Sequence, residues 1–235
     1  MKNAQIKARH EYKYLCSMGQ IAILDARLKD LLECDAHAGE NGCYTIRSIY
    51  FDDYNNSCYY DNENGIDNRK KYRIRIYNCD DSRISLECKE KIHGKTVKTS
   101  CLLSLENAER FVLSHPIEDD TDYPPLLRKF NSLFITKGLH PVIIVEYDRK
   151  PYIYPAGNVR VTLDMNIRSS CDTKDFWNPL LSCRPILETG KHLLEVKFDE
   201  FIPDFIRYSL QTEYLDYTSF SKYYLCRKYR TGGQL

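Results

Sequence analysis

The sequence lacks the spacings that mark zinc-bound cysteines. It has 10 cysteines among 235 residues, but no CxxC pair and no cysteine–histidine spacing of the zinc type, which excludes the common structural zinc sites. It also lacks an apolar run at its start, and no stretch approaches the roughly 18 apolar residues that a membrane-spanning helix requires. We therefore expect a cytoplasmic protein whose cysteines remain free thiols.

An excess of either charge is also missing. Lysine and arginine number 34 and aspartate and glutamate 33, so the formal net charge is +1. This balance does not fit a basic nucleic-acid-binding protein, and any basic site must be local. There is no internal repeat or low-complexity linker, and the length is ample for one core, so we expect a single domain over residues 1–235.

What the sequence does contain is a set of strand-like segments that place their charges on one face. In residues 72–77 (YRIRIY), Arg73 and Arg75 share a face because successive side chains of a strand point to opposite sides. Five segments alternate in this way, and the residues on their charged faces are Arg9, Glu11 and Lys13; Arg73 and Arg75; Glu87, Lys89 and Lys91; Arg160, Thr162 and Asp164; and Glu195 and Lys197. Repeated arginine and lysine on one face indicate a surface that holds a polyanion.

The predicted elements are mostly strands. We expect strands at 7–15, 43–52, 57–61, 70–78, 83–93, 95–103, 142–154, 158–165 and 191–198, and helices at 125–137, 203–211 and 218–229. Two further helices begin after caps: Ser17 and Gln20 match a capping box, and Ser104 precedes a second helical pattern. Gly138 is expected to end the helix at 125–137, and Gly94 to lie in a turn between two strands.

This order of elements predicts an α+β fold. About nine strands in mostly antiparallel order are enough to close a barrel, so we expect a closed antiparallel β-barrel with helices packed outside. If the apolar strand faces pack outward against the helices, the charged faces point inward. The interior would then be a polar tunnel.

A tunnel lined with arginine and lysine suits phosphate chains. Arginine donates bidentately to phosphoryl oxygens, and lysine supplies a compact charge. A glutamate among these cations fits a divalent cation, because Mg²⁺ and Mn²⁺ bind through one or two carboxylates plus substrate phosphates. Glu195 and Glu11 are therefore the metal candidates, and such a site could transfer a phosphoryl group without a protein nucleophile.

The charged strands also resemble a known family. The similar motifs are, in chain order, Glu11-Tyr12-Lys13-Tyr14, Ser48-Ile49-Tyr50-Phe51-Asp52, Tyr72-Arg73-Ile74-Arg75-Ile76-Tyr77, Leu86-Glu87-Cys88-Lys89, Gly94-Lys95-Thr96-Val97-Lys98, Val145-Glu146-Tyr147-Asp148-Arg149, Val159-Arg160-Val161-Thr162-Leu163-Asp164, Leu194-Glu195-Val196-Lys197 and Phe220-Ser221-Lys222-Tyr223. Together they resemble the VTC (vacuolar transporter chaperone) domain, the polyphosphate polymerase branch of the CYTH-like triphosphate tunnel metalloenzymes.

The resemblance implies an enzyme that binds ATP and polyphosphate. Polymerases of this branch add the terminal phosphoryl group of ATP to a growing polyphosphate chain and release ADP, with Mn²⁺ or Mg²⁺ as cofactor. The implied phosphate contacts, with Lys197 added from its strand face, are Lys13, Arg73, Arg75, Lys89, Lys98, Arg149, Arg160, Lys197 and Lys222. Among them Arg73, Arg75, Lys89 and Arg160 are expected to act in catalysis, and Glu195 is the implied metal ligand, with Glu11 beside it.

Two positions depart from the family pattern. The wider superfamily opens with an ExExK strand, but here Arg9 stands at the first glutamate, which weakens the metal site expected of a tunnel triphosphatase. Ser219 stands where eukaryotic polymerases tend to have a second lysine. No nucleic acid is expected as a partner, and any translocation of product would need a separate membrane protein.

Other interpretations of these residues remain open. The same tunnel could hydrolyse tripolyphosphate or a nucleoside triphosphate, or bind polyphosphate or inositol phosphates without catalysis. Among single residues, Glu195 could be a salt-bridge partner of an arginine, and Lys89 could pair with Glu87. Lys98 and Lys222 could be solvated lysines. The run 69–71 is expected to be exposed and generic, although it could collect anions near a tunnel mouth. The pair at 52–53 could bind a metal or form the entry to a turn.

Overall fold

The structure is a computed structural model that describes residues 9–35, 38–39, 41–92 and 95–230. Its strands are β1 (His10–Ser17), β2 (Glu33–Cys34), β3 (Tyr44–Asp52), β4 (Arg69–Tyr77), β5 (Asp80–Ile92), β6 (Lys95–Leu103), β7 (His140–Tyr154), β8 (Val159–Ser170), β9 (Arg184–Pro185), β10 (Lys191–Phe198) and β11 (Asp216–Tyr217). Its α-helices are α1 (Met18–Leu28), α2 (Ser57–Glu63), α3 (Leu105–Val112), α4 (Pro125–Lys137), α5 (Asp204–Ser209) and α6 (Lys222–Arg230). The turn predicted at Gly94 lies outside the described residues.

The strands form one open sheet, so the expected closed barrel is wrong. The hydrogen-bonding order is β11-β1-β10-β8-β7-β3-β4-β5-β6, and in the part of the chain that the structure describes β11 and β6 are its two ends. Closure needs a ladder of hydrogen bonds between the end strands. β11 has only two residues, and both already pair with β1. The charged faces therefore belong to an open sheet, and the tunnel that depended on closure is not formed by these pairings.

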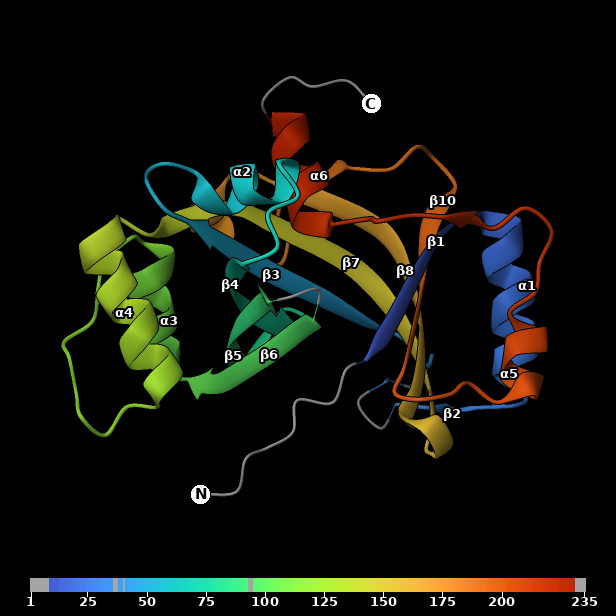
Figure 1. The fold of residues 1–235 in the computed structure, drawn as a ribbon. Helices are drawn as coiled ribbons and strands as arrows, with labels where there is room; N and C mark the ends of the chain where they lie inside the picture. The colour runs from blue at the N-terminus through green and yellow to red at the C-terminus, as the bar shows by residue number, and fades with distance from the viewer. Residues whose placement is uncertain (1–8, 36–37, 40, 93–94, 231–235) are drawn as a thin grey trace. The chain divides into compact units, whose positions relative to one another are not determined.

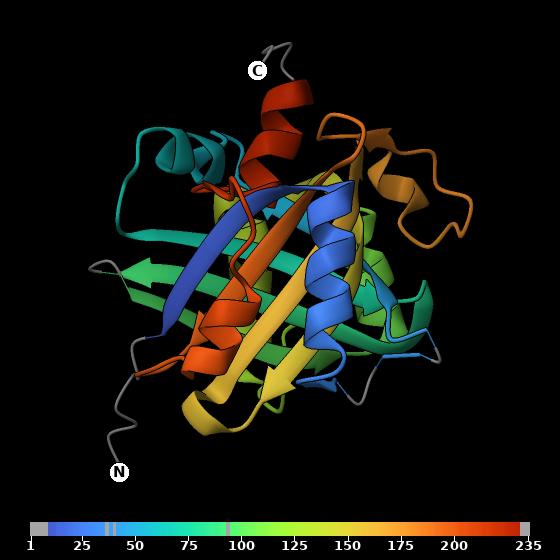
Figure 2. The ribbon, with the colours of Figure 1, turned by 90° about the vertical axis from the view of Figure 1, so that its right-hand side faces the viewer.

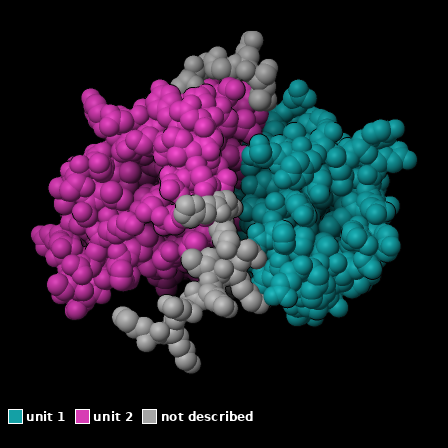
Figure 3. Space-filling view, viewed as in Figure 1, with its two compact units in different colours: residues 1–45, 147–167, 187–220 teal, residues 46–146, 168–186, 221–235 magenta. Residues whose placement is uncertain are grey.

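The chain divides into two compact units (Figure 3), each with its own core. Unit 1 comprises residues 1–45, 147–167 and 187–220, and unit 2 comprises residues 46–146, 168–186 and 221–235. Three strands, β3, β7 and β8, begin in one unit and end in the other. The single domain expected over 1–235 stays a prediction.

The core of unit 2 lies between helices and the apolar faces of its strands. α3 and α4 lie side by side next to β5 and β6 (Figure 1), and Phe111 of α3 packs edge-on against Phe130 of α4 at 4.8 Å between ring centroids. Ile74 and Ile76 of β4 are fully buried in the same core. The predicted alternation of 72–77 is confirmed, because Arg73 and Arg75, which alternate with these isoleucines, occupy the other face.

The core of unit 1 is built in the same way. α1 packs on β1 and β10 with α5 beside it (Figure 2), and its Leu24 and Leu28 are buried against strand residues such as Val161 and Val196. The capping box predicted at Ser17 is confirmed: its hydroxyl accepts from the Gln20 amide, and the Gln20 side chain accepts from the Ser17 N–H.

One predicted strand is wrong, and two helix ends are confirmed. Residues 57–61, predicted as a strand, lie in helix α2. Ser104 caps α3 by accepting from the Asn107 N–H, and Gly138 ends α4 in the left-handed conformation at φ 60°. All ten cysteines are free thiols. Among the described residues, no helix combines the length and apolar character needed to cross a membrane.

Candidate functional site

The charged face of unit 2 is organised in rows that run across β4, β5 and β6. The antiparallel register places Arg75 opposite Ser85, Arg73 opposite Glu87 and Lys71 opposite Lys89. In the next pair of strands, Lys89 is opposite Lys98. Residues opposite one another in an antiparallel pair point to the same face. We call this set the cationic cluster: Lys71, Arg73, Arg75, Glu87, Lys89 and Lys98.

A buried carboxylate stands in the middle of this cluster. Glu87 is only 3% exposed; its Oε2 accepts from Arg73 Nε at 2.7 Å, and its Oε1 accepts from Lys98 Nζ at 2.7 Å. Arg75 Nη1 lies 3.8 Å from the same Oε1. Burial alone would raise the pKa of the Glu87 carboxyl, but Arg73, Arg75 and Lys98 outweigh it and hold that pKa well below its ordinary value.

Glu87 fixes the positions of these cations without neutralising the cluster. The six residues comprise five positive side chains and one carboxylate, so they carry a net charge of +4. Two further contacts orient the arginines: Arg73 Nη1 donates to the Tyr50 hydroxyl at 2.8 Å, and Arg75 Nε donates to the Ser48 hydroxyl at 3.2 Å. An excess of positive charge held on a strand scaffold is suited to a polyanion.

The sequence had not pointed to Glu87 or Lys71 as site residues. The Lys71 ammonium contacts Asn62 Oδ1 at 2.5 Å and Ser221 Oγ at 3.2 Å. Ser221 directly precedes Lys222, which begins α6. The lysine taken from the family motif therefore lies beside the cationic cluster. The alternation of β4 could have identified Lys71, because Lys71 lies two positions before Arg73 and therefore on the same face.

In unit 1 the predicted arginine Arg149 is buried and paired. Its Nε and Nη2 donate to the two carboxylate oxygens of Asp164 at 2.6 and 2.7 Å, and Nη2 is 3.4 Å from Glu195 Oε2. Burial lowers the pKa of the Arg149 guanidinium, but the charge of Asp164 and that of Glu195 more than reverse this and raise it well above the ordinary value. This geometry favours a role in holding Glu195 over direct contact with a phosphate.

The other predicted residues of unit 1 form alternating ion pairs on one face. Lys13 is opposite Glu195, and Glu11 is opposite Lys197. Lys13 Nζ is 2.9 Å from Glu11 Oε1, and Lys197 Nζ is 2.9 Å from Glu195 Oε1. Arg160, opposite Lys197 on β8, donates to Asp35 Oδ2 at 2.8 Å. Positive and negative groups are therefore close to balance here, in contrast to the cationic cluster.

The two carboxylates Glu11 and Glu195 are compatible with a divalent cation. They occupy diagonal positions on neighbouring strands, at a separation of about 7–8 Å between Cα atoms. Among the described residues, no group of three or more histidine, cysteine, aspartate or glutamate side chains is placed to hold a metal. An ion here would thus take its remaining ligands from a phosphate substrate, as Mg²⁺ commonly does.

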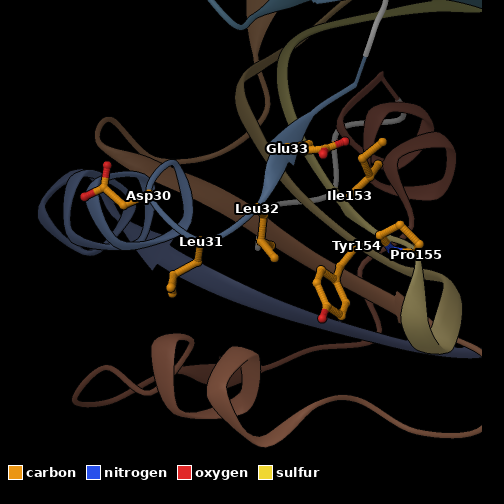
Figure 4. A pocket seen from close by; sticks show the side chains of 7 residues that line it. All are labelled: Asp30, Leu31, Leu32, Glu33, Ile153, Tyr154 and Pro155. Carbon is orange, nitrogen blue, oxygen red and sulfur yellow. The ribbon is translucent and has the colours of Figure 1, made fainter.

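Two hollows of unit 1 differ in chemistry. One, of about 300 Å³, is lined by Asp30, Leu31, Leu32, Glu33, Ile153, Tyr154 and Pro155 (Figure 4). Its described lining includes two carboxylates and no lysine or arginine, which does not suit a phosphate. The neighbouring hollow, of about 240 Å³, is lined in part by Arg9 and Arg160. Arg9 is 3.2 Å from Asp199, so both arginines already have carboxylate partners.

Comparison with known proteins gives one family and one shared fold. The family model described as VTC domain matches residues 8–229, while no curated protein matches the chain. HpAC1 from Hippeastrum, a candidate adenylyl cyclase described as having a dominant triphosphatase activity, is 12% identical, with 97% of each chain covered and a TM-score of 0.53. At this identity the likeness shows the fold alone.

Two other solved structures are similar at lower TM-scores. PH1819 from Pyrococcus horikoshii OT3 is 15% identical over 94% of this chain and 99% of its own, with a TM-score of 0.49. A Bacillus halodurans protein described as a candidate adenylate cyclase is 17% identical over 88% of this chain and 86% of its own, with a TM-score of 0.47.

Proposed function

Because the chain belongs to the VTC domain family, we propose that it is a polyphosphate polymerase. It would transfer the terminal phosphoryl group of ATP to a polyphosphate chain and release ADP. The observation that carries this proposal is the cationic cluster, in which five positive side chains share one strand face with a single buried carboxylate. Both substrates of the reaction are polyanions, and arginine and lysine are the residues that bind phosphoryl oxygens best.

In this proposal the cluster acts by positioning and charge stabilisation. Arg73 and Arg75 hold the reacting phosphoryl groups, and Lys89 and Lys98 hold the adjoining ones. Glu87 keeps Arg73 and Lys98 in place before the substrate arrives. Preorganised positive charge stabilises the charge that spreads over the phosphoryl oxygens during transfer, so no protein nucleophile is needed.

We propose that Glu11 and Glu195 are the ligands of the divalent cation, Mn²⁺ or Mg²⁺. When bound, such an ion would offset the negative charge of the phosphate groups. Arg149 and Lys197 hold the Glu195 carboxylate in place. Lys13, Arg160 and Lys197 stay in this proposal as phosphate contacts of unit 1.

Phosphorus NMR of the purified protein incubated with ATP and Mn²⁺ tests the proposal. A growing signal from internal phosphoryl groups, matched by ADP, is the expected result. Orthophosphate without a chain signal would favour a triphosphatase, and an unchanged ATP spectrum would favour a binding module; either would contradict the polymerase. The matched variants are Arg73→Gln, expected to lose turnover, and Lys70→Gln, which alters an exposed lysine that is paired with Glu90 at 2.6 Å on the opposite face of β4.

A further inference from the structure

The tripeptide Glu-Asn-Gly occurs at two places in the chain, at 40–42 and at 63–65. An asparagine before a glycine is chemically reactive, because glycine has no side chain to hinder the approach of the carboxamide to the glycine nitrogen. That nitrogen can attack the carboxamide carbon and displace ammonia. Because the same three residues occur in both copies, the surrounding structure decides which copy reacts faster.

The second copy forms the end of helix α2 in unit 2. Asn64 follows the last helical residue, Glu63, and Gly65 adopts the left-handed conformation at φ 67°. The Ile66 N–H donates to the Asp61 carbonyl at 2.9 Å, which is the outer hydrogen bond of a Schellman motif. Glycine is the usual residue at this left-handed position. The end of the helix and the reactive pair therefore depend on the same glycine.

The backbone nitrogen of Gly65 is weakly held. Its distance to the Asn62 carbonyl oxygen is 3.4 Å, whereas ordinary N–H···O hydrogen bonds measure about 2.7–3.2 Å. Asn64 is exposed. Apart from the atoms of its chain neighbours, no described heavy atom lies within 4 Å of the position that a Cβ of Gly65 would occupy. The Asn64 carboxamide therefore has space to approach this nitrogen.

The first copy, in unit 1, is held more firmly. The Gly42 N–H donates to the Gly39 carbonyl at 2.7 Å. A Cβ on Gly42 would lie 3.2 Å from Cys34 Sγ and 3.4 Å from Lys150 Cε. A short hydrogen bond must break before the Gly42 nitrogen can react, and neighbouring side chains already occupy the space beside it.

We propose that Asn64 is a site of spontaneous deamidation to aspartate and isoaspartate. The Gly65 nitrogen forms a bond to Asn64 Cγ, the Cγ–Nδ2 bond breaks, and ammonia leaves with the proton of the Gly65 N–H. The product is a cyclic succinimide. Water then opens the ring: aspartate forms where the new Cγ–N bond breaks, and isoaspartate forms where the original peptide C–N bond breaks. The balance is asparagine plus water giving acid plus ammonia, so no oxidant or reductant is required.

Isoaspartate at position 64 would change the end of α2. The main chain gains one methylene group, so the geometry that brings the Ile66 N–H to the Asp61 carbonyl is lost. The new carboxylate also places a negative charge at the C-terminus of the helix, where it is unfavourable. Asn62, which accepts from Lys71 Nζ at 2.5 Å, lies in the last turn of this helix and would be held less firmly after the modification.

Mass spectrometry of tryptic peptides from folded protein aged in mildly alkaline buffer tests the inference. Cleavage at Arg47 separates the two copies, and isoaspartyl methyltransferase with labelled S-adenosylmethionine marks the isoaspartate. We expect Asn64 to react about fivefold faster than Asn41, which corresponds to about 1 kcal/mol, the contribution of one backbone hydrogen bond. In denaturant, where neither copy is held, the two rates should agree within about twofold.

The matched variant is Asn64→Gln, because glutamine keeps the carboxamide but would have to form a larger ring. It should lose the signal of the peptide after Arg47 and keep the signal at Asn41. Four results would overturn the inference: no isoaspartate at position 64, a rate at Asn41 in folded protein that equals or exceeds the rate at Asn64, an unchanged ratio of the two rates in denaturant, or persistence of the signal in Asn64→Gln. The readout involves no ATP, metal or turnover, so its outcome is independent of the proposed function.

Discussion

Replacing Glu87 by glutamine tests whether the cationic cluster is held together by one buried charge. Glu87 makes short ion pairs with Arg73 and Lys98 and lies near Arg75. Removing one partner of a buried ion pair typically costs about 3–5 kcal/mol, whereas a half-exposed partner such as Lys98 contributes only about 0–1 kcal/mol. We therefore expect Glu87→Gln to lower the free energy of unfolding by about 3 kcal/mol, or the melting midpoint by roughly 6–12 °C for a chain of this size.

Anion binding should reverse part of this loss. The variant cluster loses its one negative charge and keeps the same positive side chains, so its net charge is more positive; tripolyphosphate should therefore bind it more tightly and raise its melting midpoint further. A ligand at about 100 times its Kd contributes about 2.7 kcal/mol, which is close to the expected loss. Turnover should nevertheless fall, because Arg73 and Lys98 lose the acceptor that positions them.

The pH dependence has a defined sign. Because the cations hold the pKa of Glu87 well below its ordinary value, its stabilisation is fully present above about pH 4.3 and is lost only as the pH falls through the lowered pKa. The difference in melting midpoint between wild type and Glu87→Gln should therefore stay constant from pH 5 to pH 8.

The assay is thermal unfolding followed by circular dichroism, with and without tripolyphosphate. Glu90→Gln is the control, since Glu90 pairs with Lys70, whose side chain is 42% exposed, and surface changes of this kind are usually within about 0.5 kcal/mol. Wild-type stability in Glu87→Gln, or equal stabilisation of both proteins by tripolyphosphate, would refute the argument.

Three further predictions concern unit 1. Glu195→Gln should reduce metal-dependent turnover far more than phosphate binding; equal losses, measured by kinetics and calorimetry, would make Glu195 only a salt-bridge partner. Arg149→Met should destabilise the fold by about 3–5 kcal/mol in urea unfolding, because it leaves Asp164 buried without its partner; a stable variant that has lost phosphate binding would instead make Arg149 a ligand. Burial lowers the pKa of His192, so between about pH 6.5 and that lowered pKa the unfolded chain binds a proton that the folded chain does not. Stability should therefore fall as the pH is lowered, and more steeply in wild type than in His192→Asn. The same pH dependence of the melting midpoint in both proteins would contradict this.

Local features of the fold were predictable because their causes lie within a few residues. The caps at Ser17 and Ser104 and the end at Gly138 depend on neighbouring side chains and backbone angles. The strand predicted at 57–61 was wrong because of a residue that lies outside that segment. Asp52 is buried and accepts hydrogen bonds from the N–H groups of Cys58 and Tyr59, which satisfies the first turn of α2. This interaction outweighs the strand preference of the tyrosines.

Alternation indicated which face carries charge, but not which charges are neutralised. Arg149, taken from the family motif, and Arg73, taken from the alternation, were both expected to contact phosphate, yet Arg149 meets a bidentate partner in Asp164 while Arg73 shares Glu87 with Lys98. Both pairs lie on strands that follow one another in the chain, so the difference depends on how each pair is aligned, which alternation does not specify. Alternation does not specify strand order either. Barrel closure failed for the same reason. Whether these residues bind phosphate stays a prediction.

The pairing of β1 with β10 has a consequence for how the chain folds as it is made. β4, β5 and β6 follow one another and can pair as soon as they leave the ribosome, whereas Ser17 of β1 must wait for Lys191 of β10. At about 5–20 residues per second this delay is roughly 10 to 35 s. Throughout it the apolar face of α1, with Ile21 and Leu24, lacks the strands that later bury it. We expect the nascent chain to be most open to proteolysis and aggregation at this helix while unit 2 is still being synthesised.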